Sequence, residues 1–101
     1  MNKIKLDNWF INDNELCIKL MQFYVGIYVS IIDNKLCYEL KVIDIKGEGL
    51  TITFSTIEDA IAFTEEVINY SSDLDSIEIK CESLYEDKVK KLERGKYGSK
   101  K

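Results

Sequence analysis

Residues 23–32 decide the fold, and they read FYVGIYVSII. From Phe23 to Ile31 every second side chain is apolar, while the side chains between them are mixed. A strand places successive side chains on opposite faces of a sheet, so this alternation predicts a central strand with one face in the core. The stretch is about half as long as a membrane-spanning helix, and Gly26 and Ser30 interrupt it, so we expect no membrane span.

Similar alternation flanks this central strand on both sides. We expect further strands over residues 15–22, from Leu36 to about Lys46 and from Leu50 to Phe54, with turns at Asp33-Asn34 and at residues 47–49. In the strand that begins at Leu36, the apolar phase shifts by one residue, which a β-bulge near Val42 would explain. Consecutive strands joined by short turns predict an antiparallel meander.

The segment after residue 54 carries signals for a helix. Ser55 and Glu58 form a capping-box pattern, in which the serine hydroxyl accepts the Glu58 N–H and the glutamate reaches back. Apolar-face residues then recur every three or four positions, and they are Ile57, Ala60, Ile61, Thr64, Val67 and Ile68. This spacing predicts one amphipathic helix from Thr56 to Tyr70, packed on the sheet.

Two shorter patterns follow this helix. Residues 76–82 alternate apolar and charged side chains, which predicts a fifth strand near an edge of the sheet. Apolar residues spaced by four and then three positions, from Tyr85 to Leu92, predict a short C-terminal helix that ends at Gly95.

The chain has 101 residues, which is enough for one small domain. We expect a single α+β domain over residues 1–95: a four- or five-stranded, mostly antiparallel sheet with one amphipathic helix on one face and a short C-terminal helix. Residues 96–101 are expected to form a loosely held basic tail. Because no apolar run follows the positively charged N-terminal residues, we expect no signal peptide and a cytoplasmic location.

The composition excludes several chemistries. The chain contains no His, so it lacks the commonest metal ligand and the usual general base. Residues 73–84 lack a glycine and several ligands that a calcium loop needs. The three cysteines have no Cys-x-x-Cys spacing and are expected to be reduced, buried thiols; they are Cys17, Cys37 and Cys81. We therefore expect no metal site, no cofactor and no enzymatic activity.

Charge is distributed unevenly along the chain. The net charge is −4, but residues 44–87 hold twelve acidic and two basic residues, and residues 88–101 hold one acidic and seven basic residues. Seven of the acidic residues form the candidate partner-binding site, here named the acidic surface: Glu58, Asp59, Glu65 and Glu66 opposite the apolar stripe of the helix, and Asp73, Asp75 and Glu78 after it. The other interpretation is that these carboxylates only keep a small protein soluble.

The predicted function is that of a small non-enzymatic protein that makes stoichiometric contact with a basic protein surface, such as that of a nucleic-acid-binding enzyme. Its size and AT-rich residue usage suggest an inhibitor encoded by a phage or mobile element, of the anti-CRISPR, anti-restriction or immunity type. The alternative is an assembly module that forms a homodimer through a strand edge or a sheet face lined by Tyr24, Tyr28 and Tyr38.

We expect no membrane binding and no direct nucleic-acid binding by the body of the protein, because acidic surfaces repel phosphates. The basic segment from Lys88 to Lys101 is either a solvated end or an arm that contacts phosphate or acidic groups.

Overall fold

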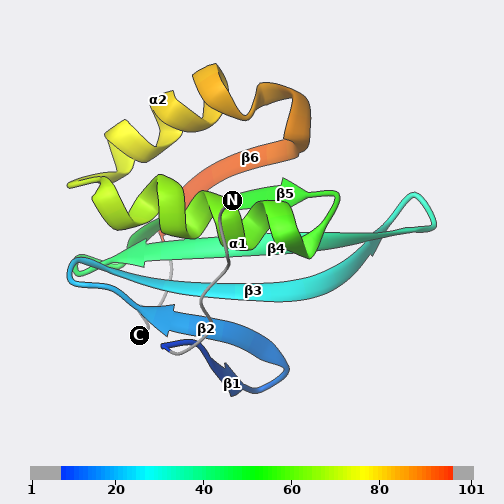
Figure 1. Ribbon diagram of the computed structural model, residues 1–101, viewed down its shortest axis with the longest axis horizontal. Helices are drawn as coiled ribbons and strands as arrows, with labels where there is room; N and C mark the ends of the chain where they lie inside the picture. The colour runs from blue at the N-terminus through cyan, green and yellow to red at the C-terminus, as the bar shows by residue number, and fades with distance from the viewer. Residues whose placement is uncertain (1–7, 97–101) are drawn as a thin grey trace.

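The computed structural model describes residues 8–96, which form a six-stranded antiparallel sheet and two helices (Figure 1). The strands neighbour one another in chain order: β1 (Phe10–Asn12), β2 (Glu15–Lys19), β3 (Phe23–Ile32), β4 (Lys35–Asp44), β5 (Glu48–Phe54) and β6 (Val89–Lys96). Between β5 and β6 the chain forms α1 (Ile57–Glu66), a 3-10 turn η1 (Ile68–Tyr70), α2 (Leu74–Leu84) and a second 3-10 turn η2 (Glu86–Lys88). The expected α+β meander is confirmed, with six strands instead of four or five.

Two expectations concern residues outside this range. The absence of a signal peptide at the N-terminus concerns residues 1–7, and the loosely held tail concerns residues 97–101; both lie outside the described residues. Lys96, assigned to the tail, is the last residue of β6. Within residues 8–96, neither helix has the length and apolar character needed to cross a bilayer.

The long β3–β4 hairpin is the centre of the sheet. Its strands pair over their full length, from Phe23 opposite Asp44 to Ile32 opposite Lys35. The two residues of its turn, Asp33 and Asn34, have positive φ angles of 53° and 64°. This geometry matches the right-handed twist of a hairpin and suits Asp and Asn, as the sequence indicates.

The two faces of the sheet differ in character. On the helix-covered face, Val25, Leu40 and Ile52 are fully buried, and α1 and α2 pack against them. The other side, here named the open face, carries both polar and apolar side chains. On this face Tyr24 pairs with Ile43, and Tyr28 pairs with Glu39. Both helices lie on the same face, which Figure 1 shows with α1 in front of β3 and β4.

The apolar stripe of α1 is buried as expected, and Phe63 joins it with no exposed surface. The helix begins one residue later than the capping-box pattern indicates, because Thr56 and not Ser55 is the N-cap. Thr56 has extended backbone angles, and its Oγ1 accepts a hydrogen bond from the Asp59 N–H at 3.2 Å. The regular α-helix ends at Glu66, and residues 68–70 continue as the 3-10 turn.

Replacing Thr56 by alanine should lower the free energy of unfolding by about 1 kcal/mol, because the Asp59 N–H loses its acceptor. Ser55→Ala should change it by less than about 0.5 kcal/mol, as expected for an exposed residue outside the cap. Urea unfolding monitored by circular dichroism measures both values. A larger loss for Ser55→Ala than for Thr56→Ala would show that Ser55, and not Thr56, caps the helix.

The predicted fifth strand at residues 76–82 is wrong, because this segment lies within α2. Asp73 caps the helix by accepting the Ser76 N–H at 2.8 Å, and Leu74, Ile77 and Cys81 form its buried stripe. Ile79, which a strand would have buried, is 64% exposed.

The predicted C-terminal helix is also wrong, because residues 89–96 form the edge strand β6. Val89 pairs with Phe54, and Lys91 pairs with Thr53, so Lys90 is an extra residue in a β-bulge. The bulge predicted near Val42 is absent, since β4 pairs with both neighbours without interruption at that position. The apolar phase shift in β4 instead places Ile43 on the open face, opposite Tyr24.

β2 is shorter than the alternation indicates, and β3 contributes fewer side chains to the core. β2 ends at Lys19, and the chain then turns through residues 20–22. In β3 the side chains of Phe23, Val25 and Ile27 are buried, but Val29 and Ile31 of the same face are 56% and 71% exposed.

Candidate functional site

The acidic surface is built on the helix layer. Two turns of α1 separate Glu58 and Asp59 from Glu65 and Glu66, so the helical repeat brings both pairs to the solvent side. α2 adds Asp75 and Glu78 beside them, and Asp73 precedes its first turn. All seven carboxylates therefore lie on the side of the sheet that the helices cover.

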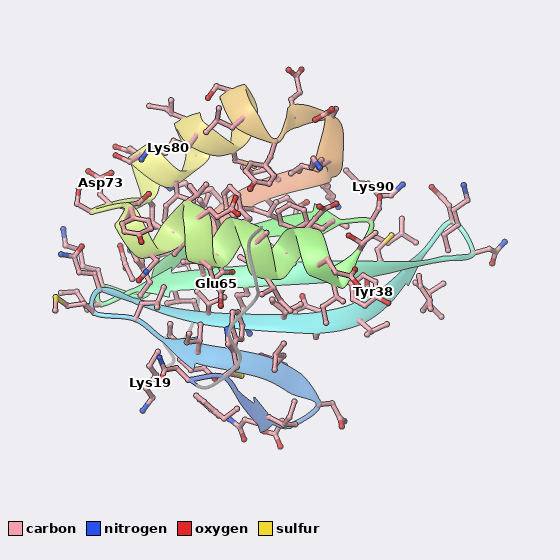
Figure 2. The ribbon with its side chains drawn as sticks, viewed as in Figure 1. Lys19, Tyr38, Glu65, Asp73, Lys80 and Lys90 are labelled. Atoms are coloured by element: carbon pink, nitrogen blue, oxygen red, sulfur yellow. The ribbon has the colours of Figure 1, made fainter. Side chains whose placement is uncertain are left out.

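The carboxylates of α1 divide between its two flanks. Glu65 Oε2 accepts a hydrogen bond from Trp9 Nε1 at 3.2 Å, on the flank that faces β2. Figure 2 shows Glu65 on the side of α1 away from α2. On the opposite flank, Glu66 Oε1 accepts the Tyr85 hydroxyl at 2.9 Å, and Asp59 Oδ1 lies 3.7 Å from Lys88 Nζ. The four residues thus do not form one continuous ridge.

Arg94 of β6 organises the carboxylates of α2. Its Nη1 lies 2.6 Å from Asp75 Oδ1 and 3.2 Å from Glu78 Oε1, and its Nη2 lies 3.7 Å from Glu48 Oε1. The hydrogen bonds to Asp75 and then to Glu78 raise the pKa of Arg94. Because β6 leads Arg94 onto the helix-covered face, one guanidinium joins α2 to both β5 and β6.

Asp73 has a structural task at the start of α2. The Ser76 N–H donates to its carboxylate at 2.8 Å, and this hydrogen bond lowers the pKa of Asp73. The charged form is thus the one that caps the helix. A partner that bound this carboxylate would compete for it with the Ser76 N–H.

The structure therefore brings together five of the seven predicted residues along the α2 side of the helix layer: Asp59, Glu66, Asp73, Asp75 and Glu78. Glu65 lies on the other flank, and Glu58 is exposed in the first turn of α1. Sequence reasoning missed the residues that contact them, which are Trp9, Tyr85, Lys88 and Arg94.

Tyr85 connects the acidic surface to the core. Its ring packs edge-on against Phe63 at 5.0 Å and against Phe54 at 6.4 Å between centroids, while its hydroxyl donates to Glu66. Burial, together with the bond to the Glu66 carboxylate, raises the pKa of Tyr85 to about 12. The neutral phenol is therefore strongly favoured in the folded state.

Stability should fall between about pH 10 and about pH 12, because unfolded Tyr85 ionises near 10 and folded Tyr85 only near 12. The stabilisation by the neutral phenol is complete below pH 10, and it is lost as the unfolded chain releases its proton first. Urea unfolding across this window should show a smaller decline for Tyr85→Phe than for the wild type. Tyr70→Phe, at a residue that is 75% exposed, is the control and should leave the decline unchanged.

The open face carries a separate polar network. Ser30 Oγ and Tyr28 Oη lie 2.8 Å and 3.4 Å from the Glu39 carboxylate, and Lys41 Nζ lies 3.8 Å from Glu15 Oε2. Tyr38 is absent from this face, because it pairs with Val29 on the helix-covered face. The register therefore splits the three tyrosines of the predicted Tyr-lined face.

The three cysteines are free thiols in the interior. Cys17, Cys37 and Cys81 are all buried and unpaired, as expected from their spacing. Across residues 8–96, no three Cys, Asp or Glu side chains are grouped closely enough to hold a metal ion.

Comparison with protein-family models, with curated proteins and with solved structures gives no match. Functional inference therefore rests on the geometry and charge of the chain itself.

Proposed function

We propose that the protein is a small non-enzymatic binding protein that makes stoichiometric contact with a basic protein surface. The contact surface is α2 together with the flank of α1 that faces it, and it includes Asp59, Glu66, Asp75 and Glu78. The class that fits its size and residue usage is an inhibitor encoded by a phage or mobile element, of the anti-CRISPR, anti-restriction or immunity type.

The observation that supports this proposal is the charge of the helix layer. Residues 57–84 hold eight acidic residues and one basic residue, Lys80, and both helices lie on one face of the sheet. Figure 2 shows Lys80 on α2 and Asp73 directly before it, at the outer side of this layer. A concentrated negative field attracts a basic partner and rejects acidic ones, so it favours fast and selective association.

The internal contacts of these carboxylates also suit a docking surface. Arg94, Lys88 and Tyr85 hold four side chains of the acidic surface in place, and Asp75 keeps 74% of its side chain exposed despite its contact with Arg94. Side chains that are already ordered lose less conformational entropy when a partner binds.

The strand edges are less suited to assembly. β1 at one edge has three residues, and β6 at the other edge carries a bulge and the exposed residues Lys90 and Lys91. Short strands, bulges and lysines are the features that keep edge strands from pairing with another chain. Tyr24 and Tyr28 of the open face are half-buried, and Tyr28 contacts Glu39, which limits a homodimer through that face.

An oligolysine peptide, labelled for fluorescence anisotropy, tests whether this surface is the cation-binding one. The triple variant Glu66→Gln, Asp75→Asn and Glu78→Gln removes three charges, while its amide oxygens can still accept from Tyr85 and Arg94. We expect the affinity for the peptide at low salt to fall by about tenfold.

The matched control removes three charges elsewhere, with Asp13→Asn, Asp33→Asn and Glu93→Gln. Asn tolerates the positive φ angles of residues 13 and 33, which are 51° and 53°, so the fold should persist. The control should weaken binding much less. Equal loss in both variants would show that the net charge alone attracts the peptide, and the proposed surface would have to be abandoned.

A further inference from the structure

The distal half of the β3–β4 hairpin exposes apolar side chains that belong to the core face of the sheet. Val29 is 56% exposed, Ile31 71%, Leu36 59% and Ile11 of β1 72%. These four residues are here named the hairpin patch. None of them is a residue of the acidic surface.

The patch is uncovered because the helix layer stops short of it. Ile31 pairs with Leu36, and Val29 pairs with Tyr38, on the face that further along buries Val25 and Val42 beneath α1. Figure 1 shows the hairpin projecting past the start of α1. The apolar face of the sheet therefore continues for several residues beyond the end of its cover.

A groove joins the patch to the packed part of the molecule. It has a volume of about 230 Å³, and its lining includes Ile11, Leu16, Val29, Tyr38 and Ile57. Ile57 is the first residue of α1, so the groove runs from the start of the helix onto the exposed hairpin. The groove is thus lined by five elements, β1 to β4 and α1.

The size of the patch indicates an interaction site. At roughly 100 Å² of apolar surface for each exposed aliphatic side chain, the four residues present about 400 Å². This equals the largest apolar patches of ordinary monomers, which are often functional. It is also about half of the ~800 Å² that each partner buries in a standard interface, and the groove and its polar rim add to it.

We propose that the hairpin patch is the interface of a twofold homodimer, in which the hairpin of a second copy packs face to face on the hairpin of the first. A twofold axis that lies between the two sheets and runs across the strands places each hairpin tip beside the start of α1 in the other copy. In an isologous contact of this kind, each copy both supplies and covers the same patch.

The thickness of the layers supports a hairpin as the occupant. Sheets packed face to face lie about 10 Å apart, and a helix with its side chains is about 10 Å across. The hairpin of the second copy therefore occupies the same layer as α1 and continues it over the exposed end of β3 and β4.

Charge supports a second copy over the basic partner proposed for the helices. The hairpin patch contains no charged side chain, so two chains of net charge −4 can meet there without direct contact between like charges. A basic partner would find no carboxylate within the patch. The hairpin tip carries one residue of each sign, Asp33 and Lys35. The start of α1 carries Glu58 and Asp59, and Lys88 Nζ lies 3.7 Å from Asp59 Oδ1.

Sedimentation equilibrium over a range of concentrations tests the proposal on the full chain. We expect the wild type to dimerise at concentrations below about 1 mM. The double variant Ile31→Thr and Leu36→Thr should weaken the dimer by at least about tenfold, because the paired residues lose their apolar contact. Threonine keeps the strand propensity of these exposed positions.

The control is Ile45→Thr with Ile79→Thr, at residues that are 87% and 64% exposed outside the patch. It should leave the association unchanged. A wild type that stays monomeric at every concentration, or a dimer that the control weakens as much as the test variant, would overturn the proposal.

A cysteine within the patch tests the twofold geometry. Ile31→Cys should form a disulfide between two copies under oxidised glutathione, because residues near a twofold axis face their own counterparts. Ile79→Cys on α2 should not. Cross-linking of both variants to the same extent would show random collision and count against a defined interface.

Discussion

Replacing Phe63 by alanine should lower the free energy of unfolding by about 3–5 kcal/mol. Phe63 has no exposed surface, and its ring lies 5.6 Å from Phe54 and 5.0 Å from Tyr85 between centroids. Truncation removes the contacts that Phe63 of α1 makes with Phe54 of β5 and with Tyr85, the residue after α2. A loss of this size is a large part of the total stability of a small domain.

Urea unfolding monitored by tryptophan fluorescence and circular dichroism measures this loss. Phe10→Ala is the matched control, because Phe10 is 39% exposed on β1, and it should lower stability by about 1 kcal/mol or less. If Phe63→Ala were as mild as Phe10→Ala, α1 could not be packed on the sheet as described.

The core strands were predictable because burial dominates their residue pattern. The alternation in residues 23–32 identifies β3, and Asp33-Asn34 identifies the turn that fixes its register with β4. The alternation could not show where the helices stop covering the sheet. Val29 and Ile31 are as apolar as Val25, and only the start of α1 at Ile57 decides that they stay exposed.

The wrong strand prediction at residues 76–82 arose because the spacing of the apolar residues fits both a strand and a helix. Ile77 and Cys81 are four apart, which fits both a strand face and a helix face, and Ile79 between them completed an apparent alternation. The helix also uses Leu74, three residues before Ile77. Asp73, with Ser76 three residues later, was the available signal, since Asp is a favoured N-cap.

The error in β6 has a different cause. Val89 and Leu92 are three residues apart, a spacing that indicates a helix, yet both face the helix-covered side of the sheet. The extra residue Lys90 in the bulge increases the spacing between these two same-face residues from two positions to three. A bulge therefore imitated helical periodicity, while the bulge inferred near Val42 does not exist.

The candidate site was predictable only in part. Acidic residues on α1 could be found by their helical spacing, but their contacts come from distant segments. Trp9 is 56 residues from Glu65, and Arg94 is 19 residues from Asp75. No local pattern links such residues, so the division of the acidic surface between two flanks of α1 could not be foreseen.

The three cysteines should react with a maleimide at least about a thousandfold more slowly in the folded protein than in urea. Cys17, Cys37 and Cys81 are 0%, 1% and 2% exposed, so reagents reach them only when the structure opens. Opening of a stable core has a free energy of several kcal/mol, which sets this factor. Burial, aided by Glu82 and Glu78, also raises the pKa of Cys81 to about 11, which reduces its reactive thiolate further.

Pulse labelling followed by mass spectrometry of peptides resolves the three sites. Arg94→Gln should accelerate labelling of Cys81 severalfold more than that of Cys17 or Cys37, because Arg94 contacts Asp75 and Glu78 and so attaches α2 to the sheet. Lys91→Gln removes the same charge from β6, but its ammonium contacts Glu93 on the open face, so labelling of Cys81 should not change. If Arg94→Gln accelerated all three sites equally, α2 would open only with the whole domain, and Arg94 would have no separate part in holding it.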